Sequence, residues 1–207
     1  MVEIRFPPPT RNITPKFEVL KVGRVIKRIF DPTRYNATPT EFRYFGPLSR
    51  FDHHRGDKPE LNSDRGIIYA GFSLSCSLVE IFGDDGTIET KHWQIANITL
   101  TQSLKLLDLR GEAAWGAGSV TSMTNTGIRK LTQAWGRYFY ENSQLYGLID
   151  GLIFNNAHNG EDAIALYERA ERSIASGKIK VTNLNDPALK ESILEIANRL
   201  NLLVELE

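Results

Sequence analysis

The sequence is poor in residues that build disulfides and metal centres. Its 207 residues include one cysteine, Cys76, and four histidines. A single cysteine cannot form an intrachain disulfide or a cysteine-based zinc site, which fits a reducing compartment. The adjacent pair His53 and His54 has no third or fourth ligand at a recognisable spacing, so we expect no metal site.

Long apolar runs and an excess of one charge are also missing. No stretch approaches the roughly 18 to 20 apolar residues that span a bilayer, and the first residues lack the pattern of a secretory signal. Lysine plus arginine and aspartate plus glutamate number 25 each. The chain as a whole therefore offers no strong attraction to nucleic acid or to an anionic membrane. We expect a cytoplasmic protein that binds neither directly.

What is present fits a globular chain with one core. Hydrophobic residues make up 41% of the sequence and charged residues 24%, which are ordinary values for a folded domain. Residues 1–16 carry four prolines and alternate poorly, so we expect an extended N-terminal arm there. Residues 17–207 are predicted to form a single domain.

Strand and helix patterns are mixed along the chain without regular alternation. Ser73 and Asp186 are predicted helix caps, and Pro187 follows the second cap. A third helix is expected over 126–140 from its helical spacing of apolar residues. The pattern predicts an α+β fold, with a mixed β-sheet core and flanking helices. Its expected strands cover 17–20, 24–30, 66–71, 87–100, 104–109, 151–154, 163–167 and 202–206.

Two finer expectations concern the core. Leu74, Leu78, Ile81 and Phe82 have the spacing of one apolar helix face. The three tryptophans are expected to be core residues because of their size; they are Trp93, Trp115 and Trp135.

A long irregular segment, residues 31–65, is a candidate for function because such loops in compact domains usually carry it. Seven arginines lie between residues 24 and 65. Guanidinium groups match phosphate oxygens bidentately, although surface arginines paired with nearby acids such as Glu41, Asp52 and Asp57 are an equally simple interpretation.

Glu80 stands out because it falls near the end of an otherwise apolar helix. A carboxylate beside small residues could stabilise positive charge on a sugar carbon, or it could be a solvated helix end. The run Gly116-Ala117-Gly118 lacks the third glycine of a dinucleotide loop. No serine or cysteine triad is indicated by the sequence.

The order of four segments resembles the RES-domain family, which is named after its arginine, glutamate and serine. In the family a first arginine follows an opening strand, and Arg28 takes this place here. Asn156 stands where the family has serine, after Asp150-Gly151. The motif around Arg50 has serine before it and phenylalanine after it, where the family has glycine and tryptophan. The remaining pieces are Phe45-Gly46-Pro47-Leu48-Ser49-Arg50-Phe51-Asp52, Gly66-Ile67-Ile68-Tyr69-Ala70-Gly71-Phe72-Ser73 and Ser77-Leu78-Val79-Glu80.

The resemblance implies an NAD-degrading toxin with a fold like that of ADP-ribosyltransferases. NAD+ would be the substrate and not a redox cofactor, with phosphate or water as acceptor, so the resemblance implies an NAD+ phosphorylase or glycohydrolase. It implies that Arg28 and Arg50 bind the NAD phosphates, that Tyr69 packs against the nicotinamide ribose, and that Glu80 stabilises the transition state. Asn156 would contact the substrate in place of serine.

Family members are commonly paired with a helix-turn-helix antitoxin of the Xre type that covers the active site, so a similar partner is expected. Two alternatives stay open. The chain could transfer ADP-ribose to a macromolecule, or it could be a non-catalytic module that binds NAD or a partner. The sequence also leaves open whether the chain forms a homodimer.

Overall fold

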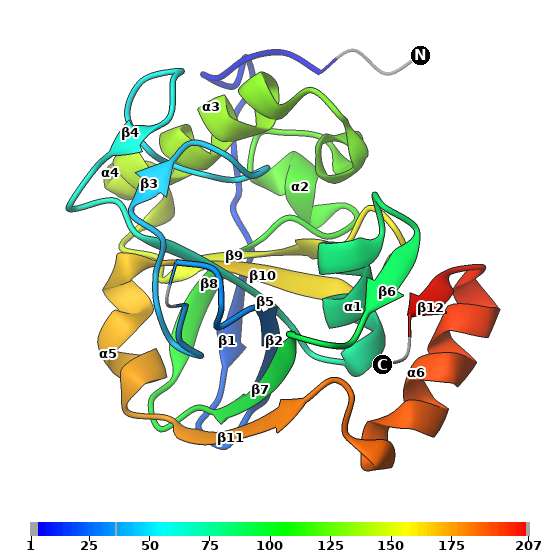
Figure 1. The fold of residues 1–207 in the computed structure, drawn as a ribbon. Coiled ribbons are helices and arrows are strands. Elements are labelled where there is room, and N and C mark those ends of the chain that lie inside the picture. The colour runs from blue at the N-terminus through cyan, green and yellow to red at the C-terminus, as the bar shows by residue number, and fades with distance from the viewer. Residues whose placement is uncertain (1–3, 36, 206–207) are drawn as a thin grey trace.

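The structure, a computed structural model, describes residues 4–35 and 37–205. Its centre is an eight-stranded sheet in the order β1-β8-β9-β10-β5-β2-β7-β11 (Figure 1). Neighbouring strands are antiparallel except β8 and β9, so the sheet is mixed. These strands are β1 (Phe17–Leu20), β2 (Val25–Phe30), β5 (Ile67–Gly71), β7 (Gln94–Thr99), β8 (Leu104–Asp108), β9 (Gly151–Asn155), β10 (Asp162–Tyr167) and β11 (Lys178–Asn183).

The middle strands are apolar because both faces of the sheet are covered. Along β9, Leu152 and Phe154 join one core cluster while Ile153, on the opposite face, joins another. A strand buried on both sides needs apolar residues at every position, which explains the continuous runs in the sequence. β9 and β10 form a hairpin, and β10 pairs with β5 in the middle of the sheet.

Helices lie on both sides of the sheet (Figure 1). Trp135 and Phe139 of α3 pack into the first core cluster, and Ile174 of α5 packs into the second. A third cluster joins α1 and α6 to β2 and β7. The helices are α1 (Leu74–Phe82), α2 (Ala113–Gly116), α3 (Arg129–Glu141), α4 (Ser143–Tyr146), α5 (Glu171–Ala175) and α6 (Pro187–Leu200), with 3-10 turns η1 (Thr121–Asn125) and η2 (Glu168–Ala170).

Two small sheets complete the fold. β3 (Phe45–Gly46) pairs with β4 (Glu60–Leu61) inside the long irregular segment. β6 (Thr87–Glu89) pairs in parallel with β12 (Leu203–Glu205) near the C-terminal end. Strands and helices thus mix as predicted, and the fold class is α+β.

Several local predictions are confirmed. Ser73 caps α1 by accepting a hydrogen bond from the Cys76 N–H, at 2.9 Å. Asp186 caps α6 by accepting from the Ala188 N–H, with Pro187 at the start of the helix. Both helices begin where the capping residues indicated, because these contacts depend only on residues two or three positions apart.

Other local predictions are wrong. The single strand expected over 87–100 is two strands, and β6 leaves the main sheet to pair with β12. α3 begins at Arg129 and not at 126, because Ile128 is only its cap and is 59% exposed. Ile81 lies outside the buried face of α1, where small residues pack instead. Trp115 is 52% exposed, stacked under the Arg11 guanidinium, so only Trp135 is a fully buried tryptophan.

The arm before β1 follows the surface of α2 and α3. The Trp135 indole N–H donates to the Arg5 carbonyl at 2.8 Å, and the Thr14 N–H donates to the Gly116 carbonyl at 2.9 Å. Gly118 lies so close to Pro9 that a side chain would not fit. The glycines at 116 and 118 therefore serve the packing of this arm.

In the described part of the chain, no helix is long and apolar enough to cross a membrane.

Candidate active site

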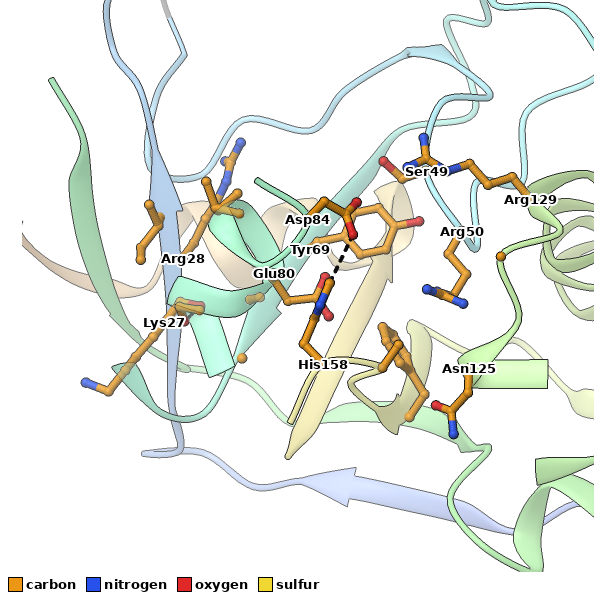
Figure 2. A pocket seen from close by; sticks show the side chains of 18 of the residues that line it. Lys27, Arg28, Ser49, Arg50, Tyr69, Glu80, Asp84, Asn125, Arg129 and His158 are labelled. Carbon is orange, nitrogen blue, oxygen red and sulfur yellow. Dashed lines mark hydrogen bonds and ion pairs between the residues drawn. The ribbon is translucent and has the colours of Figure 1, made fainter. Parts of the chain in front are cut away.

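A cavity of about 460 Å³ opens where β2, β5 and α1 meet the segment before α3 (Figure 2). Its volume is in the range of small-molecule sites. Four of the five residues predicted from the sequence line it, namely Arg28, Arg50, Tyr69 and Glu80. The remaining polar lining residues are Lys27, Ser49, Ser77, Asp84, Asn125, Thr126, Arg129 and His158.

Glu80 provides the carboxylate of the cavity. It lies near the end of α1, and its side chain faces Arg50 across the cavity (Figure 2). Glu80 as a whole residue is exposed, but its carboxyl group lies at the cavity wall with protein atoms around it. This burial raises the pKa of Glu80; the Arg50 guanidinium opposes the rise and the Asp84 carboxylate adds to it. An acidic group next to a cation in a cavity suits charge stabilisation.

Arg28 lines the cavity from β2. Its Nη1 donates to the carbonyls of Thr38, Pro39 and Glu41, at 3.0, 3.2 and 2.9 Å. Burial lowers the pKa of Arg28 to about 10, and the guanidinium stays charged at neutral pH. All three bonds come from Nη1. They fix the orientation of the guanidinium and hold the start of the irregular segment over β2.

Arg50 and Tyr69 are linked by the short turn of residues 48–52, which carries Arg50 and accepts the side chain of Tyr69. Arg50 donates to the Thr126 carbonyl, which ties it to the segment before α3. The Tyr69 hydroxyl donates to Asp52 Oδ1 at 2.9 Å and accepts from the Phe51 N–H at 3.0 Å. Burial, then the Asp52 charge, raises the pKa of Tyr69 well above its usual value. Tyr69 therefore contributes its ring to the cavity while its hydroxyl holds the turn.

Asn156 is placed differently from the prediction. It is buried and is not among the described residues that line the cavity. Its Nδ2 donates to Glu80 Oε1 at 2.6 Å, and its Oδ1 accepts from the His158 N–H. With its amide engaged on both sides, Asn156 contacts Glu80 and not the open space of the cavity. The sequence alone does not reveal this, because the two residues are 76 positions apart.

Other lining residues were missed by sequence reasoning. Arg129 opens α3 and donates to the Leu48 carbonyl at 3.1 Å. His158 lies 3.6 Å from Asp84 at the mouth of the cavity. Neither residue belongs to a sequence motif that indicates a functional site. Arg129 could have been suspected from its place at the start of a predicted helix, but nothing local indicates that this helix faces Glu80.

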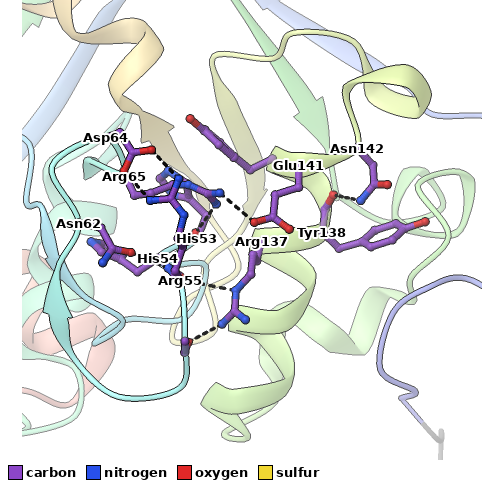
Figure 3. Close-up of polar contacts among 12 residues, drawn as sticks. His53, His54, Arg55, Asn62, Asp64, Arg65, Arg137, Tyr138, Glu141 and Asn142 are labelled. Atoms are coloured by element: carbon purple, nitrogen blue, oxygen red, sulfur yellow. Dashed lines mark hydrogen bonds and ion pairs between the residues drawn. The ribbon is translucent and has the colours of Figure 1, made fainter.

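The remaining arginines of the irregular segment serve the fold. Arg55 pairs with Asp64, and the buried Arg65 donates to Glu141 and to the His53 carbonyl (Figure 3). His53 is itself buried against Glu168, with 3.1 Å between Nε2 and Oε2. Within the described residues, neither histidine joins a group of three or more possible metal ligands. The interpretation as paired surface arginines is correct for Arg34 with Asp31 and for Arg55 with Asp64, and Arg43 pairs with Asp52, one of the acids named for it. Arg65 is paired but buried, and Arg28 and Arg50 line the cavity.

The fold and this cavity define a class of protein, an α+β domain with an arginine- and carboxylate-lined pocket. The model of the RES domain family matches residues 25–187 of the chain. This range covers most of the sequence and includes all the residues that line the cavity. The chain therefore belongs to the RES domain family.

One solved structure gives the fold comparison. A chain in the M. tuberculosis MbcT–MbcA toxin–antitoxin complex is similar, with a TM-score of 0.55 and 17% identity. The match covers 84% of the present chain and 90% of that chain. At this identity the similarity concerns the fold alone. A comparison with curated proteins gave no match.

Proposed function

We propose that this protein cleaves NAD+ at the bond between nicotinamide and ribose, and that it acts as a toxin or defence effector. The observation that carries the proposal is the placement of Glu80 opposite Arg50 in one cavity with Arg28 and Tyr69. Membership of the RES family and the fold shared with a chain of a toxin–antitoxin complex support it.

The chemistry needs few groups. The C1′–N bond breaks, the electron pair leaves with nicotinamide, and positive charge develops on the ribose. Glu80 would stabilise this charge, while Arg28 and Arg50 would bind the diphosphate. An oxygen of phosphate or water then bonds to C1′ and loses a proton to solvent. Holding the ribose between these groups contributes to catalysis by proximity and orientation.

The test is to incubate the purified protein with NAD+, with and without phosphate, and to identify the products by mass spectrometry. We expect nicotinamide together with ADP-ribose 1″-phosphate in phosphorolysis, or with ADP-ribose in hydrolysis. ADP-ribose attached to a protein or nucleic acid would instead indicate transfer to a macromolecule. Intact NAD+ under both conditions, with folded protein, would contradict the proposal.

Glu80→Gln should lower the rate of NAD+ cleavage roughly 100-fold or more, because the amide removes the negative charge that faces the reacting sugar. The exposed Glu89, in β6 and outside the cavity lining, provides a matched control. Glu89→Gln should retain the wild-type rate. Equal rates of NAD+ cleavage for Glu80→Gln and wild type would contradict the role of Glu80 in stabilising the transition state. An unchanged biological effect of Glu80→Ala would favour the non-catalytic binding module.

We also propose an antitoxin partner of the helix-turn-helix class that covers the cavity. Exposed apolar side chains lie in its lining or next to lining residues in the sequence; they are Leu48, Ile81 and Ile128. Such side chains favour contact with another protein. A helix-turn-helix protein that co-purifies with the chain should inhibit NAD+ cleavage in competition with NAD+. Inhibition that excess NAD+ does not relieve would contradict a partner over the cavity.

A further inference from the structure

We propose that Asp52 is a positioning residue for the proposed NAD+ site, which holds both Arg50 and Tyr69 in place. This inference rests on the proposed function. Asp52 does not line the cavity, and its carboxylate is completely buried. It lies two residues after Arg50, at the end of the turn formed by residues 48–52.

The Asp52 carboxylate accepts hydrogen bonds from three parts of the chain. Arg43 Nη2 donates to both oxygens, at 2.9 and 2.8 Å. The backbone N–H groups of Leu48 and Ser49 donate to Oδ2, and the Tyr69 hydroxyl donates to Oδ1 at 2.9 Å. One carboxylate thus closes the turn on itself and joins it to β5.

The same turn is held from the other side by α3. Gln133 Nε2 donates to the Ser49 carbonyl at 3.1 Å, and Arg129 donates to the Leu48 carbonyl. Backbone N–H groups bond to Asp52 while backbone carbonyls bond to α3, so the turn is fixed on both edges. Ser49 and Arg50 of this turn line the cavity, and Figure 2 shows Arg50 opposite Glu80.

Replacing the buried Asp52 carboxylate should displace the turn that its hydrogen bonds hold. In Asp52→Asn one oxygen becomes an NH2 group, which faces N–H or O–H donors in either orientation of the amide. The Arg43 guanidinium also loses its ion pair, which has an N–O distance of 2.8 Å. The turn should then sample other conformations, and Arg50 and Tyr69 should move with it.

The first experiment measures steady-state NAD+ cleavage by Asp52→Asn. We expect KM for NAD+ to rise roughly 10- to 100-fold, the equivalent of one charged hydrogen bond, while kcat changes less. Glu168→Gln is the matched control, because Glu168 also accepts two hydrogen bonds, from His53 and Tyr140, without contacting residues 48–52. The control should lose stability without a comparable rise in KM. Equal KM values for Asp52→Asn and wild type would overturn the proposal.

The second experiment is a double-mutant cycle with Tyr69→Phe. Tyr69→Phe removes the bond between the Tyr69 hydroxyl and Asp52, and Asp52→Asn disturbs the same bond through the displaced turn. The combined effect on kcat/KM should therefore be clearly smaller than the product of the single effects. Independent, multiplicative effects would show that Asp52 does not act through Tyr69.

A third measurement does not depend on turnover. Hydrogen exchange of peptides covering residues 45–53 should become faster in Asp52→Asn than in wild type, with exchange in β9 and β10 unchanged. Faster exchange in a protein that leaves NAD+ intact would reject the proposed function and retain the structural role of Asp52. Unchanged exchange of residues 45–53 would overturn the positioning role itself.

Discussion

Glu80 shows how single residues acquire their properties from neighbours distant in the sequence. Burial raises its pKa, Arg50 lowers it, and Asn156 donates a hydrogen bond to Oε1. A donor to the charged form of a carboxyl group favours ionisation. Asn156 therefore supports Glu80 from behind the cavity wall.

This arrangement predicts the effect of Asn156→Ala on the pH profile of NAD+ cleavage. Without the amide donor the pKa of Glu80 should rise further, so the fall in kcat on the acid side should move to higher pH. Rates measured across a pH series would reveal the shift. Asn155→Ala is the control, because Asn155 bonds to Gly160 and Asp162 and not to Glu80. An unmoved acid limb would contradict this role of Asn156.

A second residue-scale prediction concerns stability. Burial lowers the pKa of His54 from 6.5 to about 4, partly opposed by the charge of Asp52. The unfolded chain therefore binds a proton at pH values where the folded chain does not. The free energy of unfolding should fall as the pH drops from 6.5 towards 4, by roughly 2 kcal/mol between pH 7 and pH 5.

Urea unfolding at both pH values checks this loss of stability. His54→Phe should show a smaller difference between pH 7 and pH 5, whereas substitution of the exposed His92 by Phe should leave the difference unchanged. Equal pH dependence in His54→Phe and wild type would show that another group is responsible.

At the scale of elements, the cavity depends on how closely α3 approaches the turn that carries Arg50. Gly136 faces the backbone of Phe51, and a Cβ at this position would lie 2.6 Å from the Phe51 carbonyl oxygen. The glycine is required by this approach and not by its own backbone conformation. α3 thus supports the turn through both Gln133 and Gly136.

Gly136→Ala tests which of two effects dominates. Alanine favours a helix over glycine by about 1 kcal/mol, but here its methyl group would overlap with backbone that cannot rotate away. We expect net destabilisation in thermal unfolding and a raised KM for NAD+. Gly127→Ala, where no atom lies within 4 Å of the added Cβ, should leave the stability near that of wild type. A Gly136→Ala variant more stable than wild type would show that the Phe51 backbone can move away from the added methyl group.

At the scale of the whole molecule, the C-terminal helix supports α1 from the side opposite the cavity. Ile193 of α6 is fully buried in the cluster that contains Leu78 and Phe82 of α1. α6 also precedes β12, which pairs with β6 directly after α1. The matched family region ends at 187, so this support comes almost entirely from residues beyond it.

Ile193→Ala should therefore destabilise the protein by about 2 to 5 kcal/mol, the usual loss for a buried isoleucine. Its neighbour Leu194 is 41% exposed, and Leu194→Ala should change the stability by about 0.5 kcal/mol or less. Denaturant unfolding of both variants provides the comparison. Similar effects of the two substitutions would show that α6 is not part of the core.

The sequence by itself determined what depends on residues close together in the chain. The caps at Ser73 and Asp186 and the buried strands β5 and β9 follow from local spacing and composition. The family motifs identified four of the cavity residues because their order is characteristic. Where local patterns misled, as for Ile81 and Trp115, packing against distant segments decided the exposure.

The tertiary structure alone decided which charges meet. Arg50 and Arg55 belong to the same irregular segment, yet one faces Glu80 and the other pairs with Asp64 on the surface. The difference arises because sheet order and the position of α3 bring separate segments to one cavity. The strength of an ion pair depends on distance in space and on burial, and neither is encoded in the spacing of residues along the chain.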